Sequence, residues 1–408
     1  MIMIQTSLSP NAQKDDILLA LSLLIRPFVW RRKSAVDALE KKLGGIVRQE
    51  HVVAVDSGRT ALFTLLKALN IGKGDEVLLQ AYTCVAVPAP VLWCDATPVY
   101  VDCTDNFTLD IADLERKITR EAKAIIVQHT FGAAADMSAI RDIAKKHNLF
   151  VIEDCAHAFG GSLDDAPLGS LSDAAFFSFG RDKCVSSVFG GAITTNSGEL
   201  NGKVRALVAS YPQPSFLWTL RQLLHPIILG IAKSTYNILG TGRLFLGVAR
   251  RLRIISRAVE RRELRGETPS FARHRFSGAL AVLALRQIEK LSQFTRHRRG
   301  CAAAYEEKLK NTRSLQLPRR TDGHAFLRYT ILTDNPKHFI AKARQHGIEL
   351  GDWYQSVIAP TGVVYEKVGY TAGSCPNAEH IATRSLNLPT HIGITQEKID
   401  AIVRYVFL

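Results

Sequence analysis

Phe177-Ser178-Phe179-Gly180-Arg181-Asp182-Lys183 is the stretch that decides the fold of this 408-residue chain. It follows the apolar run 149–152, which leads to Asp154, and it precedes the glycine pair at 190–191. An apolar strand that ends near a carboxylate is typical of an open parallel α/β sheet, which presents its ligands at the carboxyl ends of its strands. The stretch therefore predicts an α/β fold with a site at Asp154 and Lys183.

The residue types at this site indicate a cofactor with an aldehyde, a pyridine ring and a phosphate, namely pyridoxal 5'-phosphate. An amine is needed to bind the aldehyde, a carboxylate to keep the pyridine nitrogen protonated, and hydroxyl or backbone donors to bind the phosphate. Lys183 supplies the amine and Asp154 the carboxylate.

The phosphate donors are expected upstream, where the strand-like run 52–55 enters a turn and then a helix that begins at Thr60. Backbone N–H groups at the start of a helix attract an anion. Gly58 lets the main chain approach closely, and Ser57 and Thr60 add hydroxyl donors. Taken alone, such a turn is more often a plain helix cap, so this interpretation depends on the rest of the site.

Apolar strands alternate with helical stretches along the first half of the chain. The strands are expected at 77–79, 98–101, 124–127 and 150–152, and the helices include 110–118 and 138–147. This alternation is typical of a doubly wound α/β sheet. A smaller α+β part follows, with a strand at 326–332 and a closing helix from Gln396. We therefore expect a large domain over 1–300 and a small C-terminal domain over 301–408.

Composition agrees with this organisation, since 408 residues of which 47% are hydrophobic and 22% charged form a large core and two domains. The seven cysteines show neither CxxC spacing nor a Cys/His cluster of zinc-ligand type, so no metal site and no disulfide framework are expected. A reducing, cytoplasmic compartment fits best. The apolar run 17–25 follows Lys14-Asp15-Asp16 and leads into Arg26. A secretory signal has its positive charge before the apolar run, so this run is not expected to be one.

Taken together, ordered segments of the chain resemble the DegT/StrS-type sugar aminotransferases. These are fold-type I enzymes that use pyridoxal phosphate to place amino groups on nucleotide-linked sugars. The resemblance covers most of the chain outside about 200–268. Its segments are 57–62, 72–77, 97–102, 129–132, 136–137, 153–158, 177–183, 375–379 and 388–391. It implies a large mixed sheet domain, a smaller C-terminal domain and a homodimer with shared active sites.

The resemblance also implies a role for each matching residue. Lys183 binds the cofactor aldehyde, and Asp154 pairs with the pyridinium nitrogen. Ser178 contacts the phosphate, and His157 borders the phenolate oxygen of the cofactor. The remaining cofactor-binding residues of the phosphate turn are Gly58, Arg59 and Thr60.

The chain departs from the family pattern at several positions. Cys84 stands where an aromatic residue usually stacks on the cofactor, so a neighbouring aromatic residue is needed for that contact. Cys184 and Phe189 replace an asparagine and a glutamate. In the segment 271–277, where a partner subunit usually supplies an asparagine to the phosphate, this chain has Arg273. Arg273 either binds the phosphate instead or is a surface arginine in a basic segment.

The activity implied by the resemblance is the transfer of an amino group from an amino acid to a nucleotide-linked ketosugar, for cell-surface polysaccharide or glycan biosynthesis. Glutamate is the donor expected from the family. Lys183 argues against the related dehydratases, in which a histidine replaces the lysine. Two alternatives stay open: a non-nucleotide or lipid-linked acceptor, and a non-catalytic regulator on the same fold.

The segment about 205–268, outside the resemblance, is both apolar and basic. Between 215 and 265 it has ten Lys or Arg residues against two glutamates, a surplus of eight in a chain of formal charge +14. Helical spacing predicts an amphipathic helix with apolar residues at Leu244, Val248, Leu252, Ile255 and Val259, opposite Arg250, Arg253, Arg257 and Arg261. No uncharged apolar run reaches the ~18 residues that a membrane span needs.

Two interpretations of this insertion remain. It lies against an anionic membrane surface, where each basic residue contributes on the order of 1 kcal/mol and Phe216 and Trp218 act as interfacial anchors. Alternatively, it packs on the enzyme dimer with its arginines in solvent. Nucleic-acid binding is not expected, because no recognisable module accompanies the charge. We expect peripheral association with the inner face of the membrane.

Overall fold

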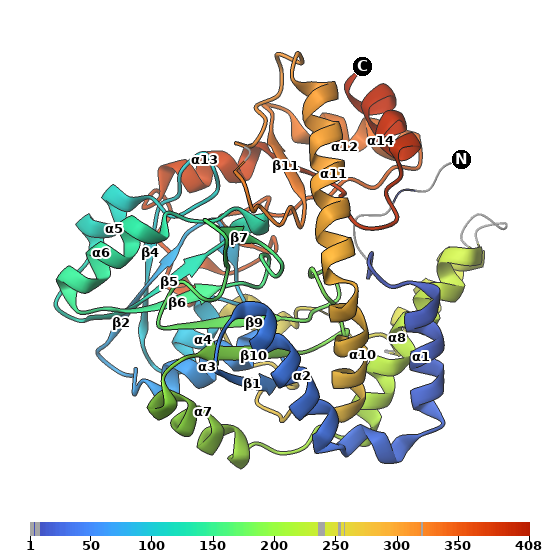
Figure 1. The fold of residues 1–408 in the computed structure, drawn as a ribbon. Coiled ribbons are helices and arrows are strands. Elements are labelled where there is room, and N and C mark those ends of the chain that lie inside the picture. The colour runs from blue at the N-terminus through green and yellow to red at the C-terminus, as the bar shows by residue number, and fades with distance from the viewer. Residues whose placement is uncertain (1–3, 5–8, 236–240, 252–253, 257, 320) are drawn as a thin grey trace.

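The computed structural model describes residues 1–408 apart from 1–3, 5–8, 236–240, 252–253, 257 and 320 (Figure 1). Its centre is a seven-stranded sheet with the strand order β1-β10-β9-β6-β5-β2-β4. The strands are β1 His51–Val55, β2 Glu76–Gln80, β4 Thr97–Val101, β5 Ala122–Gln128, β6 Phe150–Asp154, β9 Ala174–Ser178 and β10 Gly191–Thr195. β10 is antiparallel to β1 and β9, and the other pairs are parallel. The predicted mixed α/β sheet is confirmed.

Helices cover both faces of this sheet, because side chains along each strand alternate between two apolar cores. In β1, Val53 and Val55 enter one core, while Val52 and Ala54 enter the other. The first face carries α3 (Gly58–Ala68), α4 (Pro88–Leu92) and α7 (Gly198–Ser210). The second face carries α2 (Lys33–Val47), α5 (Ile111–Lys117), α6 (Met137–His147) and α10 (Gly278–Glu289). The result is a three-layer architecture.

The C-terminal part of the chain is joined to this body by α10 and α11 (Leu291–Leu309), which follow one another closely (Figure 1). It contains β11 (Tyr329–Leu332), α12 (Pro336–Gln345), α13 (Pro376–Arg384), β13 (Ser385–Leu388) and α14 (Gln396–Ile402). β11 and β13 pair antiparallel and share a separate apolar core with α11, α12 and α14. The expected boundary at residue 300 falls within α11, and the division into two domains stays a prediction.

One short strand of the C-terminal part returns to the large sheet body. β12 (Ile358–Ala359) pairs in parallel with β3 (Thr83–Cys84), so the segment around Tyr354 lies over the carboxyl ends of the sheet strands. The remaining short elements are the hairpin of β7 (Ser162–Leu163) and β8 (Ala166–Pro167), with η1 (Pro27–Arg31), η2 (Thr130–Gly132), η3 (Arg261–Arg265), η4 (Tyr365–Val368) and η5 (Val403–Phe407).

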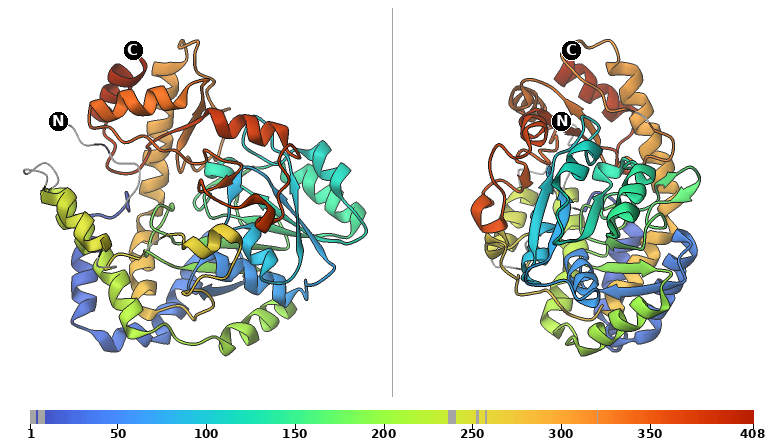
Figure 2. Two further views of the ribbon diagram at one scale, coloured as in Figure 1. Left: turned by 180° about the vertical axis from the view of Figure 1, so that it is seen from behind. Right: turned by 90° about the vertical axis from the view of Figure 1, so that its left-hand side faces the viewer.

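Three further helices form a layer beside α10: α1 (Lys14–Leu24), α8 (Phe216–Thr235) and α9 (Thr241–Arg251). α1 and α8 lie side by side (Figures 1 and 2). Their close approach requires glycine at 230, where an added Cβ atom would lie 2.6 Å from the Cδ1 atom of Ile17. At the other end of the pair, the rings of Trp30 and Phe216 stack with their centroids 4.4 Å apart.

The amphipathic helix predicted over 244–259 is wrong beyond Arg251, where α9 ends. Ile255 is buried against α8 instead of extending an exposed apolar stripe. This contact explains the early end, since the chain turns back onto α8 after α9. Leu252, Arg253 and Arg257 lie outside the described residues. None of the described helices is long and apolar enough to span a membrane.

Candidate active site

A cavity at the carboxyl ends of β6 and β9 collects most of the residues that the sequence singles out. Its lining includes Ser57, Gly58, Arg59, Asp154, His157, Ser178 and Lys183. Cys84, Gln128, Phe131, Asp182, Arg328, Trp353 and Tyr354 line it as well. Residues from Ser57 to Tyr354, which are far apart in the chain, thus surround one space, as expected for the strand ends of an α/β sheet.

Asp154 is the buried last residue of β6. Its Oδ1 atom accepts a hydrogen bond from the backbone N–H of Ala156 at 2.9 Å. Burial raises the pKa of Asp154 to about 6, although the positive charge of Lys183 acts in the opposite direction. Because burial disfavours the charged form of Asp154, a further cation held against it would stabilise the carboxylate. A protonated pyridine nitrogen is such a cation.

Lys183 lies in the loop that follows β9, and this loop is held at both of its ends. The carbonyl oxygen of Lys183 accepts a hydrogen bond from the Nδ2 atom of Asn11 at 2.9 Å, and its N–H donates to the carbonyl of Gly180. The side chain of Lys183 reaches the cavity that Asp154 also lines. The predicted amine and carboxylate therefore share one cavity.

The start of α3 and the end of β9 form a close turn beside this lysine. Ser57 is the N-cap of α3, and its Oγ atom accepts a hydrogen bond from the backbone N–H of Thr60 at 3.2 Å. A Cβ atom at Gly58 would lie 3.1 Å from the Cβ atom of Ser178, so the close approach of the two segments depends on glycine. The first N–H groups of a helix have no partner within the helix. With the Ser178 hydroxyl, they provide the donor set that a phosphate needs.

Three of the predicted phosphate-binding residues have other partners in the structure. The guanidinium of Arg59 lines the cavity but forms an ion pair with Glu263 at 2.8 Å. Thr60 is fully buried, and its Oγ1 atom accepts a hydrogen bond from the backbone N–H of Arg273 at 2.9 Å. The Arg273 guanidinium lies 5.3 Å from the ring centroid of Phe63, away from the lining of its own cavity. Their roles toward a phosphate stay predictions.

His157 is neutral, and its hydrogen bond to Phe131 indicates which ring nitrogen carries the proton. Its Nδ1 atom accepts a hydrogen bond from the backbone N–H of Phe131 at 3.3 Å, so the proton lies on Nε2. Burial and the charge of Lys183 hold the pKa of His157 well below its usual value. The Nε2 atom lies 3.4 Å from the hydroxyl of Tyr354 and thus faces the cavity side of the ring.

Aromatic side chains surround the position where Cys84 departs from the family pattern. Phe131 stacks on His157 with a centroid distance of 5.5 Å and an interplanar angle of 4°. Tyr354 lies 5.5 Å from Phe131, and Trp353 lines the same cavity. Aromatic side chains that could stack on the cofactor in place of the usual residue at position 84 therefore line the same cavity as Cys84.

Sequence reasoning assigned no role to Arg328 and Asp182, nor to the cavity residues Gln128, Trp353 and Tyr354. Arg328 is 4% exposed, its Nη2 atom lies 3.4 Å from Asp182, and its guanidinium lies 3.6 Å from the ring centroid of Trp353. Burial works to raise the pKa of Asp182, but the charges of Lys183 and Arg328 outweigh it and lower the pKa to about 2. The available signal was that Arg328 is the one charged residue in the strand-like run 326–332.

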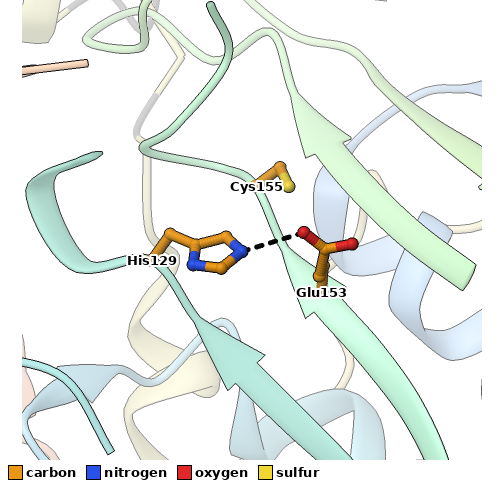
Figure 3. A group of neighbouring side chains, drawn as sticks. All are labelled: His129, Glu153 and Cys155. Atoms are coloured by element: carbon orange, nitrogen blue, oxygen red, sulfur yellow. Dashed lines mark hydrogen bonds and ion pairs between the residues drawn. The ribbon is translucent and has the colours of Figure 1, made fainter. Parts of the chain in front are cut away.

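His129, Glu153 and Cys155 form a buried group of neighbouring side chains (Figure 3), and Glu153 and Cys155 flank Asp154 in the chain. His129 Nε2 lies 3.0 Å from Glu153 Oε2, and the same carboxylate accepts backbone N–H groups from the turn at 169–171. His129 Nδ1 accepts another backbone N–H, and burial raises the pKa of the Cys155 thiol. Because its ligand atoms are used internally, we interpret this group as a hydrogen-bond network that fixes the end of β6, not as a metal centre.

The sheet order, the cavity at the strand ends and the lysine–aspartate pair define the class of a fold-type I pyridoxal phosphate enzyme. Comparison with known proteins identifies the family. The model of the DegT/DnrJ/EryC1/StrS aminotransferase family matches residues 12–213 and 248–407, and the chain belongs to this family. It is an aminotransferase, and the cofactor of its family is pyridoxal 5'-phosphate.

Known relatives match the sequence of this protein over most of its length. GDP-perosamine synthase of Caulobacter vibrioides is 30% identical over 89% of this chain and 87% of its own length. A UDP-N-acetyl-3-dehydro-alpha-D-glucosamine 3-aminotransferase of Acidithiobacillus ferrooxidans is 31% identical over 96% and 93%. Among solved structures, a DegT/DnrJ/EryC1/StrS aminotransferase of Brucella abortus has a TM-score of 0.75 at 23% identity and covers 100% of this chain and 98% of its own. The last comparison supports the fold.

Proposed function

We propose that the protein transfers the amino group of glutamate to a nucleotide-linked ketosugar, in the biosynthesis of a cell-surface polysaccharide or glycan. The observation that carries the proposal is the placement of Lys183 and Asp154 in one cavity of an aminotransferase fold. The sugar class is supported by relatives named for GDP- and UDP-linked sugars. A polysaccharide product is supported by a relative named as the spore coat polysaccharide biosynthesis protein SpsC of Bacillus subtilis, 29% identical over 92% of this chain.

The residues of the cavity fit pyridoxal phosphate. Asp154 would pair with the ring nitrogen, Lys183 would bind the aldehyde, and the turn at Gly58 with Ser178 would hold the phosphate. His157 would donate its Nε2 proton toward the phenolate oxygen. When bound, the cofactor supplies an aldehyde that takes up and returns an amino group, and a protonated ring that withdraws electrons from the substrate.

The chain's own groups account for proton transfer and water exclusion. The Nζ atom of Lys183 is the base that removes a proton from the α-carbon of the amino donor and later returns a proton to the product. A cation held against Asp154 would favour its ionised form, and Asp154 would in turn keep a bound pyridine nitrogen protonated. Phe131 and Tyr354 provide an apolar wall that limits water around these groups.

The assembly and location are further parts of this proposal. The enzyme would be a homodimer in which Arg273 reaches the phosphate of the partner's cofactor, because its guanidinium is not directed into its own cavity. It would work in the cytoplasm, at the inner face of the membrane. The alternative acceptor, a lipid-linked sugar, is kept because α1, α8 and α9 carry large exposed apolar side chains.

The experiment that tests the function separates its two half-reactions. Purified protein is incubated with pyridoxal phosphate and glutamate, and the change in the cofactor spectrum is followed. Ketosugars linked to GDP, UDP or dTDP are then added, and the aminated product is detected by mass spectrometry. We expect conversion with glutamate and with at least one nucleotide ketosugar, and none in Lys183→Ala. Absence of any amino-donor reaction contradicts the proposal, whereas a donor reaction without a nucleotide acceptor favours a lipid-linked one.

A further inference from the structure

Exposed apolar side chains are concentrated on one helical layer of the molecule. Of the thirteen large hydrophobic side chains that are exposed among the described residues, ten belong to residues 18–28, α8 and α9. They are Leu18, Leu21, Ile25, Phe28, Phe216, Leu217, Ile231, Leu244, Phe245 and Val248. Exposed apolar groups scattered singly need no explanation, but a group of this size on neighbouring elements marks an interaction surface.

The exposed residues of α1 and its C-terminal end repeat at helical spacing. Leu18, Leu21 and Ile25 follow one another at three and four residues, while Ala20 and Leu23 of the same helix are buried in the core. Ile25 and Leu18 are 81% and 65% exposed. The outer side of this helix is therefore apolar, with no described element packed over these side chains.

The two neighbouring helices extend this surface. α8 runs antiparallel to α1, because Ile17 packs against Gly230 while Trp30 stacks on Phe216. α9 folds back onto α8, and Leu244 on its outer side is 70% exposed. The exposed groups thus belong to helices that contact one another, since α8 packs against α1 and also against α9 (Figures 1 and 2).

Apart from Asp15 and Asp16 of α1, the charged residues of this layer are basic. Residues 17–36 contain four Lys or Arg and residues 216–259 contain seven, and neither segment contains an Asp or Glu. Arg26, Arg31 and Arg32 are exposed next to the apolar residues of α1. The nearest acid groups on α1, Asp15 and Asp16, are both ion-paired with Lys290. Exposed leucine and isoleucine therefore alternate with arginine on a surface without free carboxylates among its own elements.

We infer that the outer side of α1, η1, α8 and α9 docks on an anionic phospholipid bilayer. Apolar side chains that enter the region between headgroups and acyl chains, with arginines at the headgroup level, are the chemistry of a helix lying in the membrane interface. A second copy of the chain is a poorer partner, since a symmetric contact would bring two basic surfaces together. The inference extends the location proposed above and does not depend on the acceptor sugar.

Part of this surface lies outside the segments matched by the family model. Residues 214–247, which include all of α8 and the first part of α9, lie in the gap between the two segments matched by the family model. The aminotransferase core is matched on both sides of this gap. α1 and η1 lie inside the matched segment 12–213, so the surface combines these two elements of the matched core with α8 and part of α9 from the gap. The surface residues do not line the cavity of Lys183 and Asp154, so vesicle binding can be tested while that cavity is unchanged.

The test measures binding of the full-length protein, loaded with pyridoxal phosphate, to two kinds of vesicle. One is phosphatidylcholine alone, and the other is phosphatidylcholine mixed with phosphatidylglycerol. We expect co-flotation with the mixed vesicles at low salt, weak binding to phosphatidylcholine alone, and release at high salt. No sugar substrate is present, so the result is independent of the proposed activity.

Two surface variants with matched controls separate the apolar and the basic contributions. Changing Arg26, Arg31 and Arg32 together to Gln should lower the vesicle affinity on the order of 100-fold. Changing Leu21, Ile25 and Leu217 together to Gln should lower it at least about tenfold. The control for charge replaces the exposed residues Arg313, Lys337 and Arg344 by Gln, and the apolar control replaces the exposed residues Val364 and Leu408.

Both controls should bind vesicles as the unchanged protein does, and all variants should keep the donor half-reaction with glutamate. Failure of the intact protein to float with anionic vesicles at low salt overturns the inference. It is also overturned if the surface variants bind as well as the controls. Concentration-dependent self-association that the Leu21, Ile25 and Leu217 changes abolish, without vesicle binding, would instead assign the surface to a second copy of the chain.

Discussion

The Nη2 atom of Arg328 lies 3.4 Å from the Oδ2 atom of Asp182, the residue that directly precedes Lys183. The same guanidinium lies 3.6 Å from the ring centroid of Trp353. One buried arginine of the C-terminal part of the chain thus holds both the loop of the cofactor lysine and an aromatic wall of the cavity. This contact joins two parts of the chain that are distant in sequence and that both line the cavity.

Replacing Arg328 by Ala should destabilise the protein by on the order of 2–3 kcal/mol, because the change leaves the Asp182 carboxylate without this cation and removes the stacking on Trp353. Arg328→Lys keeps the charge and should cost less. Free energies of unfolding from urea titration of the cofactor-free proteins measure the difference. Equal stability of Arg328→Ala and the unchanged protein would show that the ion pair contributes nothing.

Gly58→Ala should weaken retention of pyridoxal phosphate, because the new Cβ atom would lie 3.1 Å from the Cβ atom of Ser178 and push the start of α3 away from β9. We expect the dissociation constant to rise at least about tenfold. The matched control is Gly45→Ala in α2, where an added Cβ atom meets nothing within 4 Å. Fluorescence titration with the cofactor measures both variants, and equal affinities would remove Gly58 from the phosphate site.

The affinity for pyridoxal phosphate should fall as the pH decreases through about 6. Burial raises the pKa of Asp154 to about 6 in the cofactor-free protein, so the carboxylate that faces the ring nitrogen is lost below this pH. The expected loss is ~10-fold for each pH unit below the pKa. In Asp154→Asn this pH-dependent loss of cofactor affinity should be absent, while amino transfer slows by orders of magnitude. Equal pH profiles for the two proteins would contradict the role of Asp154.

Arg273→Ala should lower the affinity for pyridoxal phosphate more than it lowers kcat, if the arginine reaches the partner's phosphate. Arg313→Ala, at an exposed arginine of the C-terminal part, is the control. Sedimentation at assay concentration should show a dimer. A fully active monomer would contradict the shared site, and unchanged cofactor affinity would make Arg273 a surface residue packed on Phe63.

Much of the fold was predictable because it depends on local patterns. The strands at 77–79, 98–101, 124–127 and 150–152 are all found, within β2, β4, β5 and β6. Their apolar side chains, bounded by helical stretches, suffice for this prediction. The strand expected at 326–332 is shorter, since β11 begins at Tyr329 and Arg328 before it turns toward Asp182.

The parts that were missed depend on contacts between distant residues. The exposed stripe of α1 was not recognised, because its exposure follows from the way α8 and α10 cover only its other side. The helix expected over 244–259 has the right spacing, yet Ile255 packs against α8 and ends it early. Arg328 shows the same limit, since its partner Asp182 is 146 residues away. Spacing along the chain does not encode such partners.

The central claim, that Lys183 binds pyridoxal phosphate in this cavity, is tested most directly by borohydride reduction of the loaded protein followed by peptide mapping. We predict that the reduced cofactor is found on the peptide that contains Lys183, and that the visible absorbance band of the bound cofactor is lost in Lys183→Ala. Lys145→Ala, at an exposed lysine of α6, should keep both. A reducible adduct and full turnover in Lys183→Ala would contradict the account.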